Sequence, residues 1–328
     1  MKYRVIGTDP ARRREVSVLA LGAMLFGSFT DERTSFALLD RYVEAGGTLI
    51  DTSDNYAYWH DGGQGGQSEE LLGRWRRSRG VGDEVLIATK LGARPLAPGT
   101  GFLDNPEGLS AGTIREAADR SRERLGVERL DLLYAHIDDP TVPQEETVAA
   151  FGALVAEGTV GLLGVSNQAA WRVERARALA AAAGLPGYEV LQYQHSLLRP
   201  RFDVPSGLFP DGSLGHAGPD LIGYLRAVPG LTLVAYSPLL AGAYVREGKP
   251  LAPDYDHPGT PARLAVLRDI ARETGATANQ VVLAWQIGAE LPIVPLAGAS
   301  TTAQLEENLA AVDLELTADQ RARLDAAH

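Results

Sequence analysis

The chain has 328 residues, of which 45% are apolar, so it can bury a sizeable core as two average domains or as one large α/β barrel. Its 31 Lys and Arg residues stand against 42 Asp and Glu residues, and the net charge of −11 disfavours nucleic acids and anionic membranes as partners. The chain has no cysteine, which excludes disulfides, thiolate nucleophiles and cysteine-ligated metal sites.

Segments of strand length and segments with helical spacing alternate along most of the chain. Strands are expected at 16–22, 48–51, 85–90, 130–136, 160–167, 189–194, 231–237 and 292–298. Helices are expected between them at 31–46, 68–78, 110–126, 144–158, 169–184 and 219–228. This alternation indicates parallel strands covered by helices, and about eight strands are what a closed barrel needs.

The C-terminal part adds helices to this pattern. Two successive helices are expected before the last strand, at 261–275 and 277–290, and two more after it, at 300–313 and 317–327. No linker interrupts the pattern. We therefore predict a single domain over residues 1–328, an α/β fold of the (β/α)8 TIM barrel type with a short N-terminal β-hairpin and extra C-terminal helices.

Two connections are longer than those usual in a barrel, at 91–109 and 195–218. Long connections in compact domains usually form lids or binding loops, so we expect both to contact the substrate. The N-terminus has no apolar signal region, and the most apolar later stretch is interrupted by Pro238. A soluble protein in the cytoplasm is expected, without a membrane partner, and its oligomeric state is left open.

Polar side chains stand at the ends of three consecutive expected strands, where a parallel barrel carries its chemistry. They are Asp51, Lys90 and His136, and Tyr56 follows shortly after the first. A lone strand-end Asp, Lys or His more often caps a helix or completes a turn. Capping does not call for all three on consecutive strands with a Tyr beside the first, so the set indicates a catalytic site.

Together these four residues form a device that can protonate a carbonyl oxygen. A Tyr phenol with an ordinary pKa of about 10 is a weak acid near neutral pH. We expect the Lys90 ammonium to lower the pKa of Tyr56, Asp51 to hold that ammonium, and His136 to share the proton or bind the substrate oxygen. Because none of the four acts as a nucleophile, they indicate hydride transfer from an external donor to a C=O group.

The sequence also resembles a known family. The motifs IDTSDNY, IATK, LDLLYAHIDDP, LGVSN, LQYQ, AYSPL and GASTTAQLEENL follow in this order over nearly the whole chain, and as a set they are similar to those of the aldo-keto reductases. The resemblance implies an oxidoreductase that uses NADPH to reduce an aldehyde or ketone, with hydride leaving the nicotinamide C4. It implies Asp51, Tyr56, Lys90 and His136 as catalytic residues, with Tyr56 as the proton donor.

The resemblance further implies the residues that hold the cofactor. Ser166, Asn167 and Gln192 match the nicotinamide carboxamide site, and Tyr236 matches the aromatic residue that stacks on the ring. The remaining matches, along the pyrophosphate, the adenosine end and the first strand, are Ser237, Pro238, Leu239, Gly298, Ser300, Gln304, Glu307, Asn308, Gly22, Met24 and Asp51. Independently, the small and hydroxyl residues after Gly298 open a helix, whose first N–H groups favour a phosphate. Taken without the other motifs, the same residues more often form an ordinary N-cap before a solvated helix face.

Two departures from the family pattern concern specificity. Many members carry basic residues near Gly298 and at Gln304, where they grip the 2′-phosphate of NADP, and both positions are neutral here. Other branches of the family with Gly and Gln in these places still bind NADP, so the resemblance favours NADPH and leaves NADH open. The frequent Tyr-Asn-Leu-Leu after the sixth strand is replaced by residues 195–198, HSLL, which is expected to alter a wall of the pocket.

Rival interpretations concern metals and the type of protein. His136, Asp138 and Asp139 could ligate a metal, but Lys90 and Tyr56 nearby disfavour a divalent cation, and no metal is expected. The alternatives to a general carbonyl reductase are a dedicated biosynthetic reductase of a keto-sugar or polyketide ketone, and a slow NADPH-sensing module resembling channel β subunits.

Trp59 is the one tryptophan that falls in the loop after Tyr56 and not on a helical pattern. It either lines the substrate pocket or packs against the protein, and the sequence favours neither.

Overall fold

The computed structural model describes residues 1–60, 63–97, 102–204, 214–246 and 248–327. Within these ranges eight parallel strands close into a barrel in the order β10-β3-β4-β5-β6-β7-β8-β9. They are β3 (Ala20–Gly22), β4 (Leu49–Asp51), β5 (Leu86–Leu91), β6 (Leu130–Ala135), β7 (Val160–Ser166), β8 (Val190–Gln194), β9 (Thr232–Tyr236) and β10 (Ile293–Gly298). The predicted (β/α)8 barrel is confirmed.

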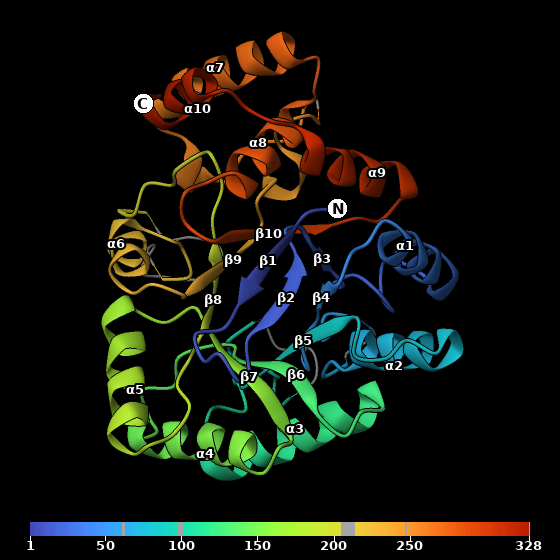
Figure 1. Cartoon of the computed structure of the whole chain (residues 1–328), viewed down its shortest axis with the longest axis vertical. Coiled ribbons are helices and arrows are strands. Elements are labelled where there is room, and N and C mark those ends of the chain that lie inside the picture. Colours follow the sequence, from blue (N-terminus) through green and yellow to red (C-terminus); the bar gives the residue numbers. More distant parts are fainter. Residues whose placement is uncertain (61–62, 98–101, 205–213, 247, 328) are drawn as a thin grey trace.

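Helices surround the barrel, as Figure 1 shows. Those that each follow a barrel strand are α1 (Glu32–Glu44), α2 (Gln67–Arg79), α3 (Ala111–Leu125), α4 (Gln144–Ala156), α5 (Ala170–Ala182) and α6 (Pro219–Ala227). The C-terminal half adds α7 (Gly259–Thr274), α8 (Ala278–Ile287), α9 (Thr302–Ala310) and α10 (Ala318–Ala326), with short 3-10 turns at Leu240–Gly242, Pro253–Tyr255 and Ala311–Asp313. The two helices expected on either side of the last strand are thus present.

The N-terminal hairpin closes the amino-terminal end of the barrel. Strands β1 (Tyr3–Ile6) and β2 (Arg14–Ser17) pair antiparallel, which confirms the predicted hairpin. Ile6 and Val16 are fully buried and pack with the apolar residues that fill the barrel interior. The hairpin therefore covers this end with hydrophobic side chains.

The single strand predicted at 16–22 is wrong, because the chain bends there between β2 and β3. At the bend the Leu19 carbonyl accepts hydrogen bonds from the hydroxyls of Ser17 (2.9 Å) and Tyr42 (2.7 Å). The two hydroxyls thus satisfy the buried Leu19 carbonyl, which would otherwise need a partner in a neighbouring strand. The chain can therefore leave the strand conformation at this point.

The core has two layers, one inside the barrel and one between the barrel and its helices. Leu49, Ala88 and Leu132 belong to the inner layer, whereas Ile50 and Leu133, the next residues along, face the helices. Side chains alternate across a strand with period two, so the inner layer shows which later residues point into the barrel mouth.

No helix in the described part of the chain is both long and apolar enough to cross a membrane.

Candidate active site

The alternation of the strands directs the predicted catalytic side chains to one place. Asp51 comes two residues after the inward-facing Leu49, and Lys90 comes two residues after the inward-facing Ala88. His136 likewise follows Tyr134, another inner-layer residue of β6. The three side chains therefore emerge at the carboxyl end of adjacent strands and meet in the mouth of the barrel.

Lys90 connects the other members of the site. Its side chain is completely buried, and its ammonium group donates hydrogen bonds to Asp51 Oδ1, to the Thr52 carbonyl oxygen (2.7 Å) and to Tyr56 Oη (3.0 Å). An ammonium has three N–H donors, so all of them are used. The structure thus brings together Asp51, Lys90 and Tyr56 as the sequence predicts.

The expected lowering of the pKa of Tyr56 is wrong for this structure. Burial raises the pKa of Tyr56, and the opposing effect of the Lys90 ammonium is smaller. The pKa of Lys90 is itself raised, because Asp51 and Tyr56 outweigh the effect of burial, so the ammonium is retained. Tyr56 therefore keeps its proton at neutral pH, and Lys90 stabilises the phenolate that would form after the proton leaves.

His136 lies on the other side of the tyrosine as a neutral imidazole. Burial, together with the nearby Lys90 ammonium, holds the pKa of His136 well below its ordinary value. Its ring lies 6.2 Å from that of Tyr56, centroid to centroid. The ring nitrogen Nδ1 is 3.0 Å from the hydroxyl of Ser53, which orients the ring and leaves Nε2 for a substrate oxygen.

The residues matched to the nicotinamide site form a continuous network with this group. Gln192 donates a hydrogen bond to Asp51 Oδ2 (2.7 Å), and Ser166 donates one to the Gln192 carbonyl oxygen (2.7 Å). Asn167 donates to the His136 carbonyl oxygen (2.9 Å) and accepts from the Tyr236 hydroxyl (3.0 Å). All of these side chains lie beside the predicted catalytic residues.

The next segment on the proposed pyrophosphate side is a tight turn after β9. Ser237 has a positive φ of 51°, and its carbonyl accepts from the Leu240 N–H at 3.1 Å. The Pro238 carbonyl accepts from Ser196, and Leu239 packs against the cluster formed by α7 and α8. These contacts hold the three matched residues in place directly after Tyr236.

The residues matched to the adenosine end gather around the start of α9. Gly298 pairs with Gly22 across β10 and β3, so two residues without side chains lie next to each other there. The Ser300 N–H donates to Gln304 Oε1 at 2.8 Å, and Asn308 donates to the Gly298 carbonyl oxygen at 3.3 Å.

Two further residues of the predicted cofactor set lie at the edges of the site. Glu307 accepts from Thr277 Oγ1 at 2.6 Å and from Asn279 Nδ2 at 3.3 Å, which joins α9 to α8. Met24, just after β3, is 46% exposed.

Aromatic residues that follow Tyr56 surround the approach to the site. Trp59 packs against Tyr56 with ring centroids 6.4 Å apart, and Tyr58 contacts both Trp59 (5.0 Å) and Phe102 (6.5 Å). Phe102 in turn lies 5.9 Å from the His136 ring, so the 91–109 connection reaches the catalytic group. Sequence reasoning missed Phe102 and Ser53, whose neighbours are distant in sequence.

Some residues that the sequence singled out have structural partners, and others lie outside the described part of the chain. Asp138 pairs with Arg172 at 2.7 Å, and Asp139 accepts from the Leu109 N–H at 2.8 Å, so both carboxylates have structural partners. His195 stacks on Trp285 of α8, and burial lowers the pKa of His195 to about 4. Residues 98–101 and 205–213 of the two long connections lie outside the described part.

Comparisons with known proteins find relatives over most of the chain. The sequence profile described as "Aldo/keto reductase family" matches residues 18–328. Norsolorinic acid reductase A of Aspergillus parasiticus is 29% identical, over 97% of this chain and 79% of its own length. Aldo-keto reductase str7 of Strobilurus tenacellus is 32% identical over 88% of this chain and 79% of its own, and the uncharacterized oxidoreductase YrpG of Bacillus subtilis is 30% identical over 96% and 92%.

A solved structure shares the fold over the full length of both chains. It is a thermostable aldo-keto reductase in complex with the inhibitor epalrestat, with a TM-score of 0.75 and 24% sequence identity.

Proposed function

Because the chain belongs to the aldo/keto reductase family, we propose that it reduces an aldehyde or ketone to an alcohol with NADPH as hydride donor and Tyr56 as proton donor. The observation that carries this proposal is the Lys90 ammonium, buried and bonded to both Asp51 and Tyr56. In that arrangement the ammonium can stabilise the phenolate that is left after Tyr56 protonates an alkoxide.

Each side chain of the site has a separate task in this proposal. Tyr56 gives its proton to the oxygen of the substrate, and Lys90 stabilises the negative charge that remains on the phenol. Asp51 holds the ammonium in place, and neutral His136 orients the carbonyl oxygen through Nε2.

The residues around the barrel mouth fit a nicotinamide dinucleotide. The cofactor, when bound, supplies the hydride, and Ser166, Asn167 and Gln192 would hold its carboxamide. At the other end Gly22 and Gly298 leave the paired strand ends without side chains, and a Cβ built at Gly298 would meet no atom closer than 4.0 Å. The start of α9 beside them offers backbone N–H groups to a phosphate.

NADPH binding and turnover are separate measurements. We expect fluorescence titration to show NADPH binding, and NADPH consumption to follow when aromatic aldehydes and diketones are added. Binding without consumption across the panel would favour the NADPH-sensing module. Absence of binding by either nicotinamide cofactor would refute the proposal.

A dedicated biosynthetic step is the second candidate for the reaction. Norsolorinic acid reductase A is named after one substrate, and in this chain Tyr58, Trp59 and Phe102 provide an aromatic approach to His136 that suits a flat, bulky ketone. Turnover of polycyclic aromatic ketones with a KM well below that for simple aldehydes would favour this candidate. The cytoplasmic location stays a prediction.

A basic residue at Gln304 is expected to strengthen the preference for NADPH. Gln304→Arg places a guanidinium at the start of α9, and one new charge-assisted contact to the 2′-phosphate raises the NADPH/NADH affinity ratio by about tenfold. Competitive titrations with the two cofactors measure this ratio, and added salt should reduce the gain.

The matched control is Gln304→Ala, because Gln304 Oε1 also accepts the Ser300 N–H and both variants lose that bond. An unchanged ratio in Gln304→Arg would place the 2′-phosphate elsewhere.

A further inference from the structure

Asp54 is a buried acid in the loop that carries Tyr56. Its side chain is completely buried, and in the described part of the chain no N–H group or hydroxyl donates a hydrogen bond to either carboxyl oxygen. The backbone of the same residue is well held, since its N–H donates to the Lys90 carbonyl oxygen at 3.0 Å. An ionised carboxylate in such a place is strongly unfavourable, so the group needs either a cation or a proton.

Two other buried carboxylates, Glu107 and Glu69, lie close enough to Asp54 to raise its pKa, and they occupy the nearby cations. Glu69 of α2 accepts from Arg124 at 3.1 Å. Glu107 of the 91–109 connection accepts from Arg94 at 3.0 Å and from Arg120 at 2.6 Å.

The three arginines are therefore committed to two of the three acids. Arg124 does reach Asp54, but only at its backbone carbonyl oxygen, 3.5 Å away.

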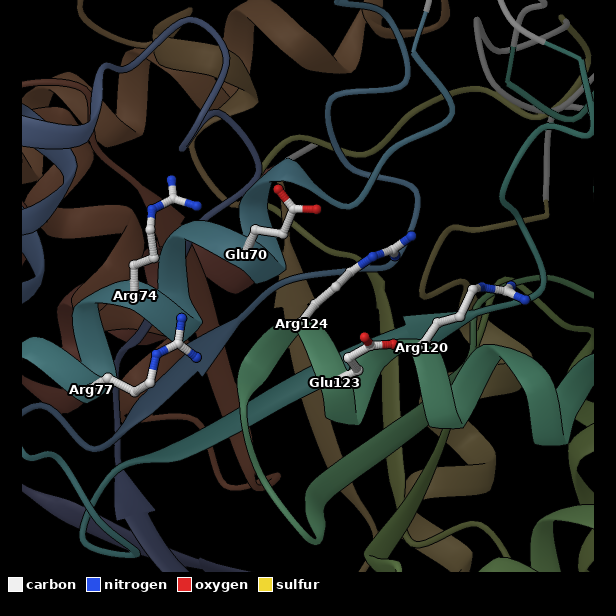
Figure 2. A pocket seen from close by; sticks show the side chains of 6 residues that line it. All are labelled: Glu70, Arg74, Arg77, Arg120, Glu123 and Arg124. Carbon is white, nitrogen blue, oxygen red and sulfur yellow. The ribbon is translucent and has the colours of Figure 1, made fainter.

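The arginines lie on the solvent side of this group. Figure 2 shows Arg120 and Arg124 extending from α3, and Arg74 and Arg77 extending from α2; these four side chains help to line an open cavity of about 490 Å³ between the two helices. The side chains of Arg120 and Arg124 are 30% and 19% exposed, whereas those of Glu107 and Glu69 are 3% and 0% exposed. The acids thus lie on the inner side of the arginines.

We propose that Asp54 carries a proton at neutral pH, donates it to Glu107, and through this link positions the loop that carries Tyr56 against the 91–109 connection. Two ionised carboxylates can only accept hydrogen bonds, whereas one proton turns Asp54 into a donor for Glu107. The surroundings of Asp54 also favour the protonated form. Burial has the largest effect, and together with Glu107 and Glu69 it raises the pKa of Asp54 well above its ordinary value, while Arg124 opposes this effect only in part.

The link would act on catalysis through Tyr56, which makes Asp54 a positioning residue. The segment from Ser53 to Tyr56 is held against β5 and the residues after it, where Asn55 donates to the Ala93 carbonyl oxygen at 3.3 Å. Glu107 precedes α3 at the far end of the same connection, so the Asp54–Glu107 bond would join the tyrosine loop to both ends of it. This catalytic part rests on the proposed function; the protonation of Asp54 does not.

Protonation makes the stability of the fold depend on pH in a defined direction. An Asp in the unfolded chain titrates near pH 4, and in the folded chain at a higher pH. The stabilisation that the proton confers is complete below about pH 4 and is lost as the pH rises through the folded pKa. Asp54→Asn keeps a donor for Glu107 but cannot ionise, so its Tm should increase relative to the wild type as the pH rises above about 4.

The test compares Asp54→Asn with Asp54→Ala in the full chain. Tm is measured between pH 4 and 9, kcat and KM at each pH, and the infrared band of a protonated carboxyl in the wild type and in Asp54→Asn. Asp54→Asn is expected to lose that band, to gain Tm with pH, and to keep a kcat about tenfold above that of Asp54→Ala, in which the tyrosine loop is less well placed. KM for NADPH should be the same in both variants.

Three results would overturn the inference. They are a Tm difference between Asp54→Asn and wild type that does not change with pH, an infrared band that persists in Asp54→Asn, and a kcat as low in Asp54→Asn as in Asp54→Ala. If the wild type shows no turnover, the Tm series and the infrared band still decide whether Asp54 is protonated, and only the proposed function fails.

Discussion

Replacing Tyr56 with Phe is expected to lower kcat by about 10²- to 10⁴-fold, the usual contribution of a positioned general acid. The phenol oxygen accepts a hydrogen bond from the Lys90 ammonium at 3.0 Å, and burial keeps the phenol protonated at neutral pH. The ring remains in Tyr56→Phe, so the packing with Trp59 and His136 should persist and the dissociation constant for NADPH should change by no more than a few-fold. Single-turnover kinetics and fluorescence titration measure the two quantities separately.

Tyr188→Phe is the matched control for this experiment. Tyr188 is also a buried tyrosine, but it packs against Phe151 in the layer between barrel and helices, away from the mouth. Its replacement should leave kcat unchanged. Equal activity of Tyr56→Phe and the wild type would remove the proposed mechanism.

Replacing Lys90 with Met is expected to stop turnover and also to lower the free energy of unfolding by about 3–5 kcal/mol, as breaking a buried ion pair does. Asp51 would remain, 2% exposed, and among the residues that the structure describes it would keep only Gln192 as a side-chain donor. Denaturant unfolding measures the loss of stability, and NADPH consumption measures the loss of activity.

A double-mutant cycle with Asp51→Asn separates the two effects. In Lys90→Met combined with Asp51→Asn no unpaired charge stays buried, so the double variant should be more stable than Lys90→Met alone, while turnover stays lost. Additive losses of stability would show that the two side chains do not interact as a pair. Normal turnover in the double variant would show that the ammonium has no role in proton transfer.

The arrangement of the barrel and its catalytic group could be predicted because both follow from local patterns. Strand periodicity, helical spacing and the residues at strand ends are all readable from neighbouring positions, and parallel strands bring their carboxyl ends to one rim. For this reason Asp51, Lys90 and Tyr56 meet as predicted. The roles assigned to Ser166, Asn167 and the residues around α9 remain predictions, since they depend on a bound dinucleotide.

What could not be predicted depends on burial and on contacts between distant segments. The sequence shows that a Lys stands near Tyr56, but only the fold shows that burial outweighs its effect on the pKa of the phenol. The bend at Leu19 depends on the hydroxyl of Tyr42, 23 residues away. Asp54 looks like an ordinary loop acid until Glu69 and Glu107 are seen to occupy the arginines around it.

The hairpin that covers the amino-terminal end of the barrel limits the routes by which Tyr56 can be reprotonated. Ile6 and Val16 are fully buried there, so apolar side chains separate Lys90 from solvent at that end of the barrel. In the proposed mechanism, Tyr56 must therefore regain its proton from bulk solvent through the same opening that releases the alcohol. Reprotonation of Tyr56 and release of the alcohol would then use the same opening. Because a larger alcohol blocks this opening more completely, the solvent isotope effect on turnover should vary with the size of the alcohol.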